Sequence, residues 1–149
     1  MSLPDGLRNT SQAKNWVDSL PLSYKYSAGV SGQRFAEGLK QGKILGSKCS
    51  KCGETFLPPS LYCPNCFVYS SEYVEIPPYG EIYSFAEADG KAIALIRFQG
   101  VTGGLIHVVK RPSAGKLKIG LRVSAVFRPA EQRKGDLTDI EFFEIRPHT

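Results

Sequence analysis

Residues 49–66 read CSKCGETFLPPSLYCPNC, and this segment holds all four cysteines of the 149-residue chain. They form two C-x2-C pairs, Cys49 with Cys52 and Cys63 with Cys66, separated by ten residues. Each pair can fold into a tight turn that points two sulfurs at one ion, and the linking segment can bring the two turns together. Thiolates at about 2.3 Å are the usual ligands of structural zinc. We therefore predict a tetrahedral zinc site made of these four residues.

The residues beside the cysteines suit such turns. Gly53 follows the second cysteine and can adopt positive φ, and Pro64 restricts φ within the second pair. Two disulfides or four free thiols are the alternatives without a metal. We see no apolar signal segment near the N-terminus, so we expect a reducing, cytoplasmic location, which disfavours disulfides.

Iron is the other candidate metal, because rubredoxins use similar cysteine pairs, although a separation of ten residues is short for them. Four sulfur ligands leave no open position for water or substrate. The zinc is therefore expected to be structural rather than catalytic.

Composition and charge narrow the classes of protein. No run of roughly 18 apolar residues is present, so we expect no membrane span.

The charge is unevenly distributed along the chain. Residues 97–134 carry nine basic residues and a single acid, Glu131, whereas residues 72–89 carry five acids and no base. The basic segment predicts an anionic ligand, such as nucleic acid or a phosphorylated small molecule. A solvated basic surface without a dedicated ligand is the alternative.

Residues 1–46 are expected to form a helical arm. One short helix is predicted at residues 12–20 and ends at Pro21; a second runs from about residue 31 or 32 to 41 and ends at Gly42. The arm carries three large apolar side chains, Trp16, Phe35 and Leu39. Two short helices cannot bury these between themselves, so we predict that they dock elsewhere, with a partner surface as the favoured place.

Residues 71–149 show strand patterns separated by glycine, proline and charged turns. The candidate strands are residues 72–76, 80–88, 92–98, 105–110, 121–128 and 138–145. Asp89-Gly90 predicts a hairpin, and Gly103-Gly104 marks the next reversal. Five or six short antiparallel strands without a long helix predict a small closed barrel of the five-stranded OB-fold type. The expected fold is mainly β, with a helical arm (1–46), a zinc ribbon (47–70) and a barrel (71–149).

Several segments together resemble a known family. They are RFAEGLKQGKILGSKC at residues 34–49, the cysteine segment itself, YGEIYSF at 79–85 and LRVSAVFRP at 121–129. The chain resembles, over roughly residues 22–145, the acyl-CoA-associated proteins of domain of unknown function family 35. The cysteine segment is the most specific part of this resemblance. The resemblance implies a rubredoxin-like zinc ribbon followed by an OB-fold.

The same resemblance implies a function. Members of the family accompany thiolases, 3-hydroxy-3-methylglutaryl-CoA (HMG-CoA) synthases or related enzymes as non-catalytic, bridging subunits, and the barrel contributes to a site for CoA or acyl-CoA. The basic excess in this barrel fits that role, because CoA carries a 3′-phosphate and a diphosphate. The candidates for contacting these phosphates are chosen by charge and position only: Arg97, Lys110, Arg111, Lys116, Lys118 and Arg128.

No catalytic constellation is found, so we expect no independent enzyme activity. His107 is interpreted as a structural residue on a strand with Leu105 and Val109, and His148 is next to the last residue. No G-x-S-x-G motif occurs. The segment before Lys116 lacks the first glycine of a phosphate-binding loop, because position 110 is lysine.

Two other classes of protein remain possible from the residues alone. Single-stranded nucleic-acid binding is one, because zinc ribbons and OB-folds occur there, but it normally needs exposed aromatic side chains. Alternation along the strand places Tyr83 and Phe85 on one face, which we expect to be the core. A pure scaffold that binds an enzyme and no small ligand is the other class.

Overall fold

The computed structural model describes residues 22–23, 25–88, 90–110 and 116–146. The helix predicted at residues 12–20, with Trp16, lies outside the described residues, as do Asp89, Arg111 and His148. Within the described ranges, no helix has the length and apolar character needed to cross a bilayer.

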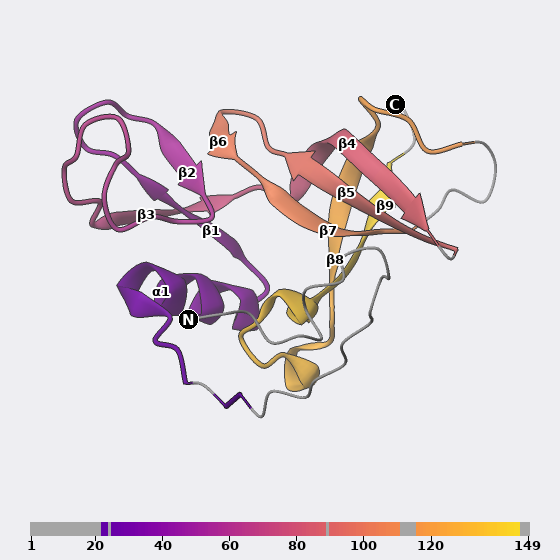
Figure 1. The fold of residues 1–149 in the computed structure, drawn as a ribbon, viewed down its shortest axis with the longest axis horizontal. Coiled ribbons are helices and arrows are strands. Elements are labelled where there is room, and N and C mark those ends of the chain that lie inside the picture. Colours follow the sequence, from indigo (N-terminus) through magenta and orange to yellow (C-terminus); the bar gives the residue numbers. More distant parts are fainter. Residues whose placement is uncertain (1–21, 24, 89, 111–115, 147–149) are drawn as a thin grey trace, which may run out of the picture.

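Four short strands form one sheet around the cysteine segment. They are β1 (Ile44–Lys48), β2 (Thr55–Leu57), β3 (Glu72–Ile76) and β6 (Val101–Gly103), in the order β3-β1-β2-β6. Strand β1 is antiparallel to both β2 and β3, and β6 is parallel to β2. Figure 1 shows β6 at the junction between this sheet and the barrel.

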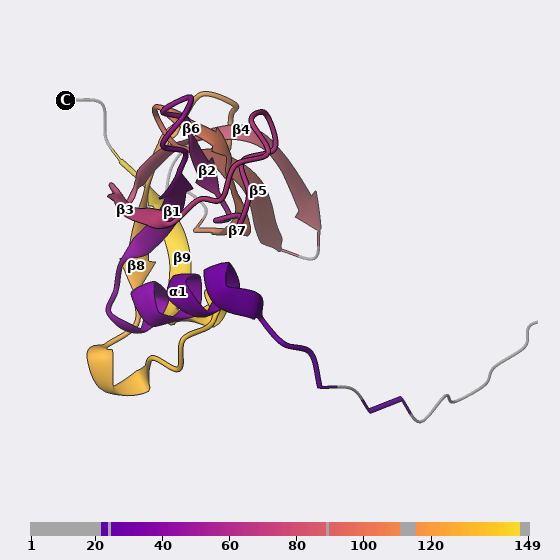
Figure 2. The same ribbon diagram turned by 90° about the vertical axis from the view of Figure 1, so that its left-hand side faces the viewer.

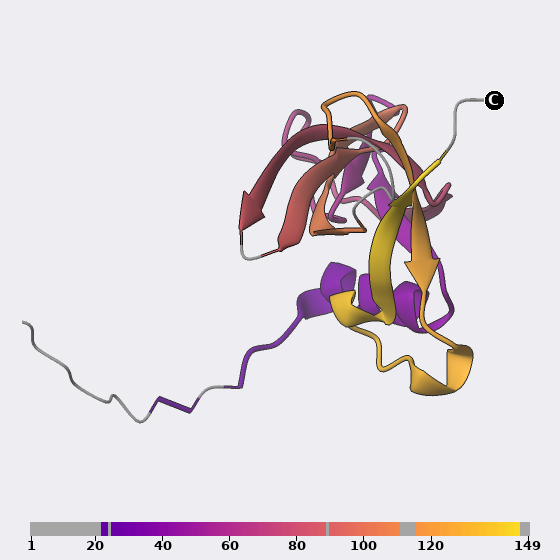
Figure 3. The ribbon, with the colours of Figure 1, turned by 90° about the vertical axis from the view of Figure 1, so that its right-hand side faces the viewer.

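Five strands close into a barrel, which confirms the predicted OB-type architecture. They are β4 (Tyr79–Ala88), β5 (Lys91–Arg97), β7 (Leu105–Val109), β8 (Arg122–Phe127) and β9 (Ile140–Ile145), in the order β4-β5-β7-β9-β8. All neighbours are antiparallel except β7 and β9. Figure 3 shows the long, curved β4–β5 hairpin on one side and the β8–β9 pair on the other.

Two strands depart from the sequence-based expectation. Residues 72–76 were expected in the barrel, but β3 pairs along its whole length with β1, from Ile44 opposite Ile76 to Lys48 opposite Glu72. Strand β6 was not predicted at all, because three residues carry too little pattern. The domain boundaries at residues 46 and 70 stay a prediction, although this sheet crosses both.

Helix α1 (Gly29–Lys40) confirms the second predicted helix, with Gly42 at φ 78 just beyond its end. Leu39 is buried in the main hydrophobic cluster, and Phe35 packs against that cluster. The prediction that Phe35 and Leu39 dock on a partner is therefore wrong. The helix lies against β1, as Figure 2 shows, and it also contacts the 3₁₀ turn η3 (Leu137–Asp139), so the chain itself covers its apolar side.

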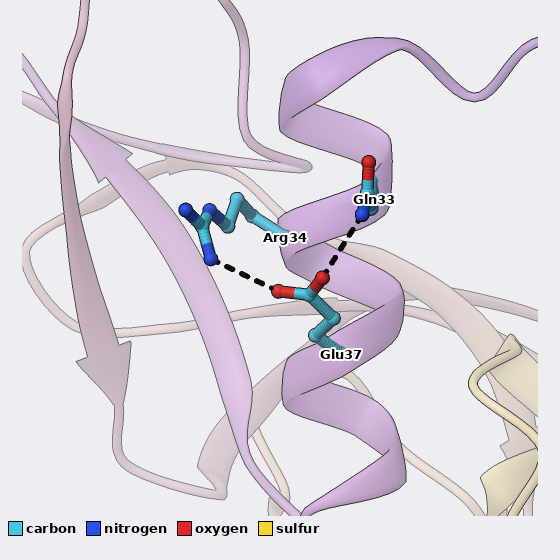
Figure 4. A network of polar contacts seen from close by, with 3 residues as sticks. All are labelled: Gln33, Arg34 and Glu37. Atoms are coloured by element: carbon cyan, nitrogen blue, oxygen red, sulfur yellow. Dashed lines mark hydrogen bonds and ion pairs between the residues drawn. The ribbon is translucent and has the colours of Figure 1, made fainter.

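The other side of α1 carries a small polar network (Figure 4). The Glu37 carboxylate accepts a hydrogen bond from Gln33 Nε2 at 3.1 Å and forms an ion pair with Arg34 at 3.1 Å. Such pairs, three and four residues apart, stabilise a helix by a few tenths of a kcal/mol. The helix is thus polar toward solvent and apolar toward the core.

One hydrophobic cluster joins the helix, the ribbon sheet and the barrel. It includes Leu39 of α1, Ile44 of β1, Leu57 of β2 and Ile140 of β9. A second, separate cluster at the tip of the ribbon contains only Cys49, Phe56 and Cys63 as buried members. The tip therefore needs a source of stability other than the main hydrophobic cluster.

A buried carboxylate connects the barrel to α1. Asp139 accepts hydrogen bonds from the backbone N–H groups of Lys134 (2.8 Å), Gly135 (2.7 Å) and Asp136 (3.3 Å). The loop held in this way approaches α1 so closely that a Cβ on Gly135 would lie 3.1 Å from the Ala36 carbonyl oxygen. The carboxylate thus fixes the loop on which the helix packs.

We expect Asp139→Asn to destabilise the protein. The new amide group would point an N–H at backbone donors, and hydrogen bonds to a charged acceptor are worth about 1.5–3 kcal/mol each. Urea denaturation should show a loss of about 2–4 kcal/mol in the free energy of unfolding. Asp136→Asn is the control, since Asn and Asp cap equally well and the change there should stay within about 0.5 kcal/mol. Equal losses in the two variants would contradict this role for Asp139.

Candidate metal centre and ligand groove

The ribbon tip brings the four cysteine sulfurs together. The Sγ atoms of Cys49, Cys52, Cys63 and Cys66 all lie within 4.8 Å of one another, and those of Cys52 and Cys63 are 3.7 Å apart. Sulfurs at about 2.3 Å from a tetrahedral zinc are about 3.8 Å from each other. A disulfide would need a separation of about 2.05 Å. This four-cysteine cluster supports a structural zinc.

The two cysteine pairs fold into matching turns. The N–H of Gly53 donates to the carbonyl of Cys49 at 2.9 Å, and the N–H of Phe67 donates to the carbonyl of Cys63 at 2.8 Å. Both donors have positive φ, 76° for Gly53 and 56° for Phe67. Glycine adopts this conformation readily, whereas a bulky residue rarely does. The shared geometry aims both pairs of sulfurs at one point.

The thiols need a cation to ionise together. The backbone N–H groups of Cys52 and Lys51 lie 3.5 and 3.4 Å from Cys49 Sγ and lower the pKa of that thiol to about 7. Burial and the neighbouring cysteine sulfurs raise the pKa of Cys66 to about 12. Four thiolates in one cluster are therefore stable at neutral pH only around a bound cation, which is how metal binding becomes coupled to folding.

A groove of about 680 Å³ lies where β4 and β8 begin and β5 and β9 end. Glu81 on β4 is flanked by Arg97 on β5 and Arg122 on β8 as its cross-strand partners. The N–H of Arg146 donates to the carbonyl of Arg122 at 2.9 Å, which adds a third arginine. We call this feature the arginine groove and define it by the lining residues Tyr79, Glu81, Tyr83, Arg97, Arg122 and Arg146.

Two tyrosine rings hold two of the guanidinium groups. Arg97 Cζ lies 3.5 Å from the ring centroid of Tyr83, and Arg146 Cζ lies 4.1 Å from that of Tyr79. Such cation–π contacts orient an arginine without neutralising its charge. Within the described part of the chain, none of the three arginines forms an ion pair. The groove can therefore offer preoriented N–H donors to an anion such as a phosphate.

The six basic candidates from the sequence do not converge. Arg97 alone lines the arginine groove, and Arg111 lies outside the described residues. The others are exposed at separate places: Lys110 after β7, Lys116 and Lys118 before β8, and Arg128 after β8. Arg122 and Arg146 were not among the candidates. Only the cross-strand register could have placed them beside Arg97.

The expectation that Tyr83 and Phe85 both face the core is wrong for Tyr83, which is 50% exposed; Phe85 lies opposite buried Ala94 of β5 and is 37% exposed. Ile82 is the residue of this segment that is buried in the barrel. The register against β5 shifts between Ile82 and Ser84, so alternation does not continue through Tyr83. Such a bulge changes the direction of the side chains that follow it.

His107 has structural contacts. Its Nε2 lies 3.0 Å from the Leu137 carbonyl oxygen, and its ring packs edge-on against Phe143 with the ring centroids 5.7 Å apart. Both contacts connect β7 to the region around β9. They agree with the structural interpretation made from the strand pattern.

A four-cysteine ribbon joined to a closed five-stranded barrel defines a zinc-ribbon OB-fold protein. Residues 36–68 match the family model of the ChsH2 rubredoxin-like zinc ribbon domain. A solved DUF35-family protein of unknown function from Sulfolobus solfataricus is 33% identical, with a TM-score of 0.61 over 78% of this chain and 84% of that chain. The present chain belongs to the DUF35 family, where DUF35 is domain of unknown function family 35.

A second solved structure, the Ltp2-ChsH2(DUF35) aldolase, is similar in fold. It is 22% identical, with a TM-score of 0.58 over 76% of this chain and 91% of that chain. A comparison with curated proteins finds no match.

Proposed function

We propose that this protein is a non-catalytic accessory subunit of an acyl-CoA enzyme complex and that it holds the nucleotide end of CoA in the arginine groove. The observation that carries the proposal is the convergence of Arg97, Arg122 and Arg146 from three parts of the barrel onto one groove with a single acid, Glu81. CoA is a compact polyanion, and guanidinium groups suit its phosphates.

The partner proposed here is a thiolase, an HMG-CoA synthase or a related acyl-CoA enzyme in the cytoplasm. This follows from the family resemblance, and the similar Ltp2-ChsH2(DUF35) aldolase pairs a DUF35 protein with an enzyme. In this proposal Cys49, Cys52, Cys63 and Cys66 hold a structural zinc that stabilises the ribbon tip. The chain contributes binding groups, and the reacting thioester belongs to the partner's active site.

Binding of single-stranded nucleic acid is the second candidate function. It is favoured by the exposure of Tyr79 and Tyr83 beside three arginines. However, guanidinium groups already cover both rings at 3.5 and 4.1 Å, so neither ring is open on that side for a base. The groove therefore favours a phosphate ligand over a stacking one.

The test is a titration of CoA and 3′-dephospho-CoA into the complex of this protein with its enzyme, after copurification from the native source and mass spectrometry identify that enzyme. We expect Arg97→Ala/Arg122→Ala to weaken CoA binding by about 2–4 kcal/mol, since each charged hydrogen bond is worth about 1.5–3 kcal/mol. Lys116→Ala/Lys118→Ala removes the same charge at two exposed residues outside the groove and is the matched control.

Three results would count against the proposal. Equal CoA affinity in both double variants would leave the arginine groove without a ligand. Partner binding with no effect of CoA would favour the pure scaffold. Salt-dependent binding of a single-stranded oligonucleotide, weakened only by the groove variant, would favour the second candidate function.

A further inference from the structure

The outer face of the barrel carries an uncovered aliphatic surface. Along β5, Ala92, Ala94 and Ile96 are buried, whereas Ile93 is 48% exposed and Leu95 is partly exposed. On the neighbouring β7, Ile106 is 68% exposed and Val108 39% exposed. We define the aliphatic face as Ala86, Ile93, Leu95, Ile106 and Val108.

The register shows that these side chains form one surface. Ile93 is opposite Val108 and Leu95 is opposite Ile106, while Ala86 on β4 is opposite Ile93. Side chains directly opposite each other in a sheet lie on the same face. The aliphatic face therefore extends across three neighbouring strands, β4, β5 and β7 (Figure 1).

The aliphatic face continues into the arginine groove. Lys91, Ile93, Leu95 and Arg97 alternate with the buried residues of β5, so they share its outer side. Ile93 is four residues from Arg97, which is about 13 Å along a strand at about 3.3 Å per residue. A ligand whose phosphates contact Arg97 would thus leave the groove beside the aliphatic face.

The charges around the aliphatic face are mainly cationic. Arg97 lies at one end, with Glu81 opposite it on β4. Lys91 and Lys110 lie at the other end, each one residue beyond the Ala92–Val109 pair of β5 and β7. Neither lysine forms an ion pair with another described residue. A second copy of this chain is a poor occupant, because a two-fold pairing of such faces would bring cations opposite cations. A protein with an apolar centre and an acidic rim is complementary.

The chemistry of the aliphatic face also disfavours nucleic acid. The outer surface of the corresponding strands is where OB-folds bind oligonucleotides, and that binding uses aromatic rings for base stacking. The aliphatic face offers branched aliphatic side chains instead. Exposed apolar patches rimmed by polar residues mark interaction or ligand-binding sites, and the charged rim described above favours a protein partner.

We infer that the aliphatic face is the surface on which the acyl-CoA enzyme docks, so that CoA held in the arginine groove leaves directly into the interface between the two proteins. The inference rests on the proposed function, because it takes the partner to be that enzyme. It adds the place of contact and its chemistry, an acidic and apolar surface on the enzyme.

The experiment compares two exposed isoleucines. Ile106→Asp places a charge in the aliphatic face, and Ile119→Asp places the same charge on a residue that is 66% exposed but belongs neither to the aliphatic face nor to the groove lining. Ile93→Asp is a second variant on the neighbouring strand. Circular dichroism and zinc content should match the wild-type chain in all three, because the residues are exposed.

The enzyme identified by copurification is then titrated into each zinc-loaded, full-length variant by calorimetry. We expect Ile106→Asp and Ile93→Asp to weaken the affinity at least about tenfold, as buried interface anchors do, and Ile119→Asp to bind like wild type. Equal affinities in all variants would overturn the docking surface and leave the proposed function intact. Absence of any acyl-CoA enzyme in the copurified material would overturn both.

Two further measurements separate the other occupants. Analytical ultracentrifugation of the chain alone would overturn the inference if the wild type were a dimer that Ile106→Asp dissociates. Titration of palmitoyl-CoA into the chain alone would overturn it if Ile106→Asp weakened that binding, since the aliphatic face would then hold an acyl chain. We expect neither effect of the substitution.

Discussion

Cys63→Ser is expected to abolish zinc binding and to unfold the tip of the ribbon. Cys63 is fully buried, and with Cys49 it belongs to the small cluster that is separate from the main core. Zinc binding contributes about 10–16 kcal/mol in isolated zinc-finger peptides, so losing even a quarter of that would be about 3 kcal/mol. The barrel should persist, because its buried residues belong to the other cluster.

Metal analysis and heteronuclear NMR would measure this outcome. We expect no bound zinc, with amide signals of residues around 49–68 lost and those of the barrel strands retained. Asn65→Ala is the control, since Asn65 lies between Cys63 and Cys66, is exposed, and donates a side-chain hydrogen bond to Glu54. A full zinc content in Cys63→Ser would falsify the four-thiolate assignment, and an iron content in the wild-type chain would replace zinc as the metal.

Gly103→Ala is expected to separate the ribbon sheet from the barrel. Gly103 ends β6 with φ 95, and a Cβ there would overlap the carbonyl oxygen of Leu57. The same carbonyl accepts a hydrogen bond from the N–H of Gly104 at 2.9 Å. Relief of the overlap would have to open the parallel pairing of β2 with β6. We expect a loss of about 3 kcal/mol or more in the free energy of unfolding, combining overpacking with the conformational cost of positive φ.

Gly100→Ala is the matched control for this prediction. Gly100 also has positive φ, 71°, but a Cβ there would have nothing within 4 Å. Its cost should be the conformational one alone, about 1–2 kcal/mol. Thermal or urea denaturation of both variants gives the difference. If Gly100→Ala proved as destabilising as Gly103→Ala, close packing against Leu57 would not be what requires glycine at position 103.

The features that the sequence predicted correctly depend on short-range patterns. Cys49 and Cys52 lie three residues apart, as do Cys63 and Cys66, so each turn is a local structure, and one metal requirement connects the two. Strand patterns bounded by glycine, proline and charged turns identified β5 and β8, and the glycine at position 42 marked the end of α1. In each case the local structure is determined by residues that lie within a few positions of one another in the chain.

The apolar residues of α1 show a limit of prediction from short-range patterns. Phe35 and Leu39 were correctly placed on one side of a helix, but the sequence could not say what covers that side. The cover is β1 and the η3 turn, and η3 begins about a hundred residues later in the chain. An apolar stripe on a helix indicates that this side of the helix must be buried, but it does not identify the surface that covers it.

What the sequence by itself determined is the four-cysteine cluster, the mainly β architecture and the general excess of positive charge. The tertiary structure decided the rest: β3 joined the ribbon sheet, and closure of the barrel assembled the arginine groove. Arg97, Arg122 and Arg146 are about 25 residues apart along the chain, and each is ordinary in its own segment. They meet because β4 lies between β5 and β8, so that Glu81 on β4 pairs with Arg97 on one side and with Arg122 on the other. Strand register is set by long-range pairing and by the bulge after Ile82, and neither leaves a local signal in the sequence.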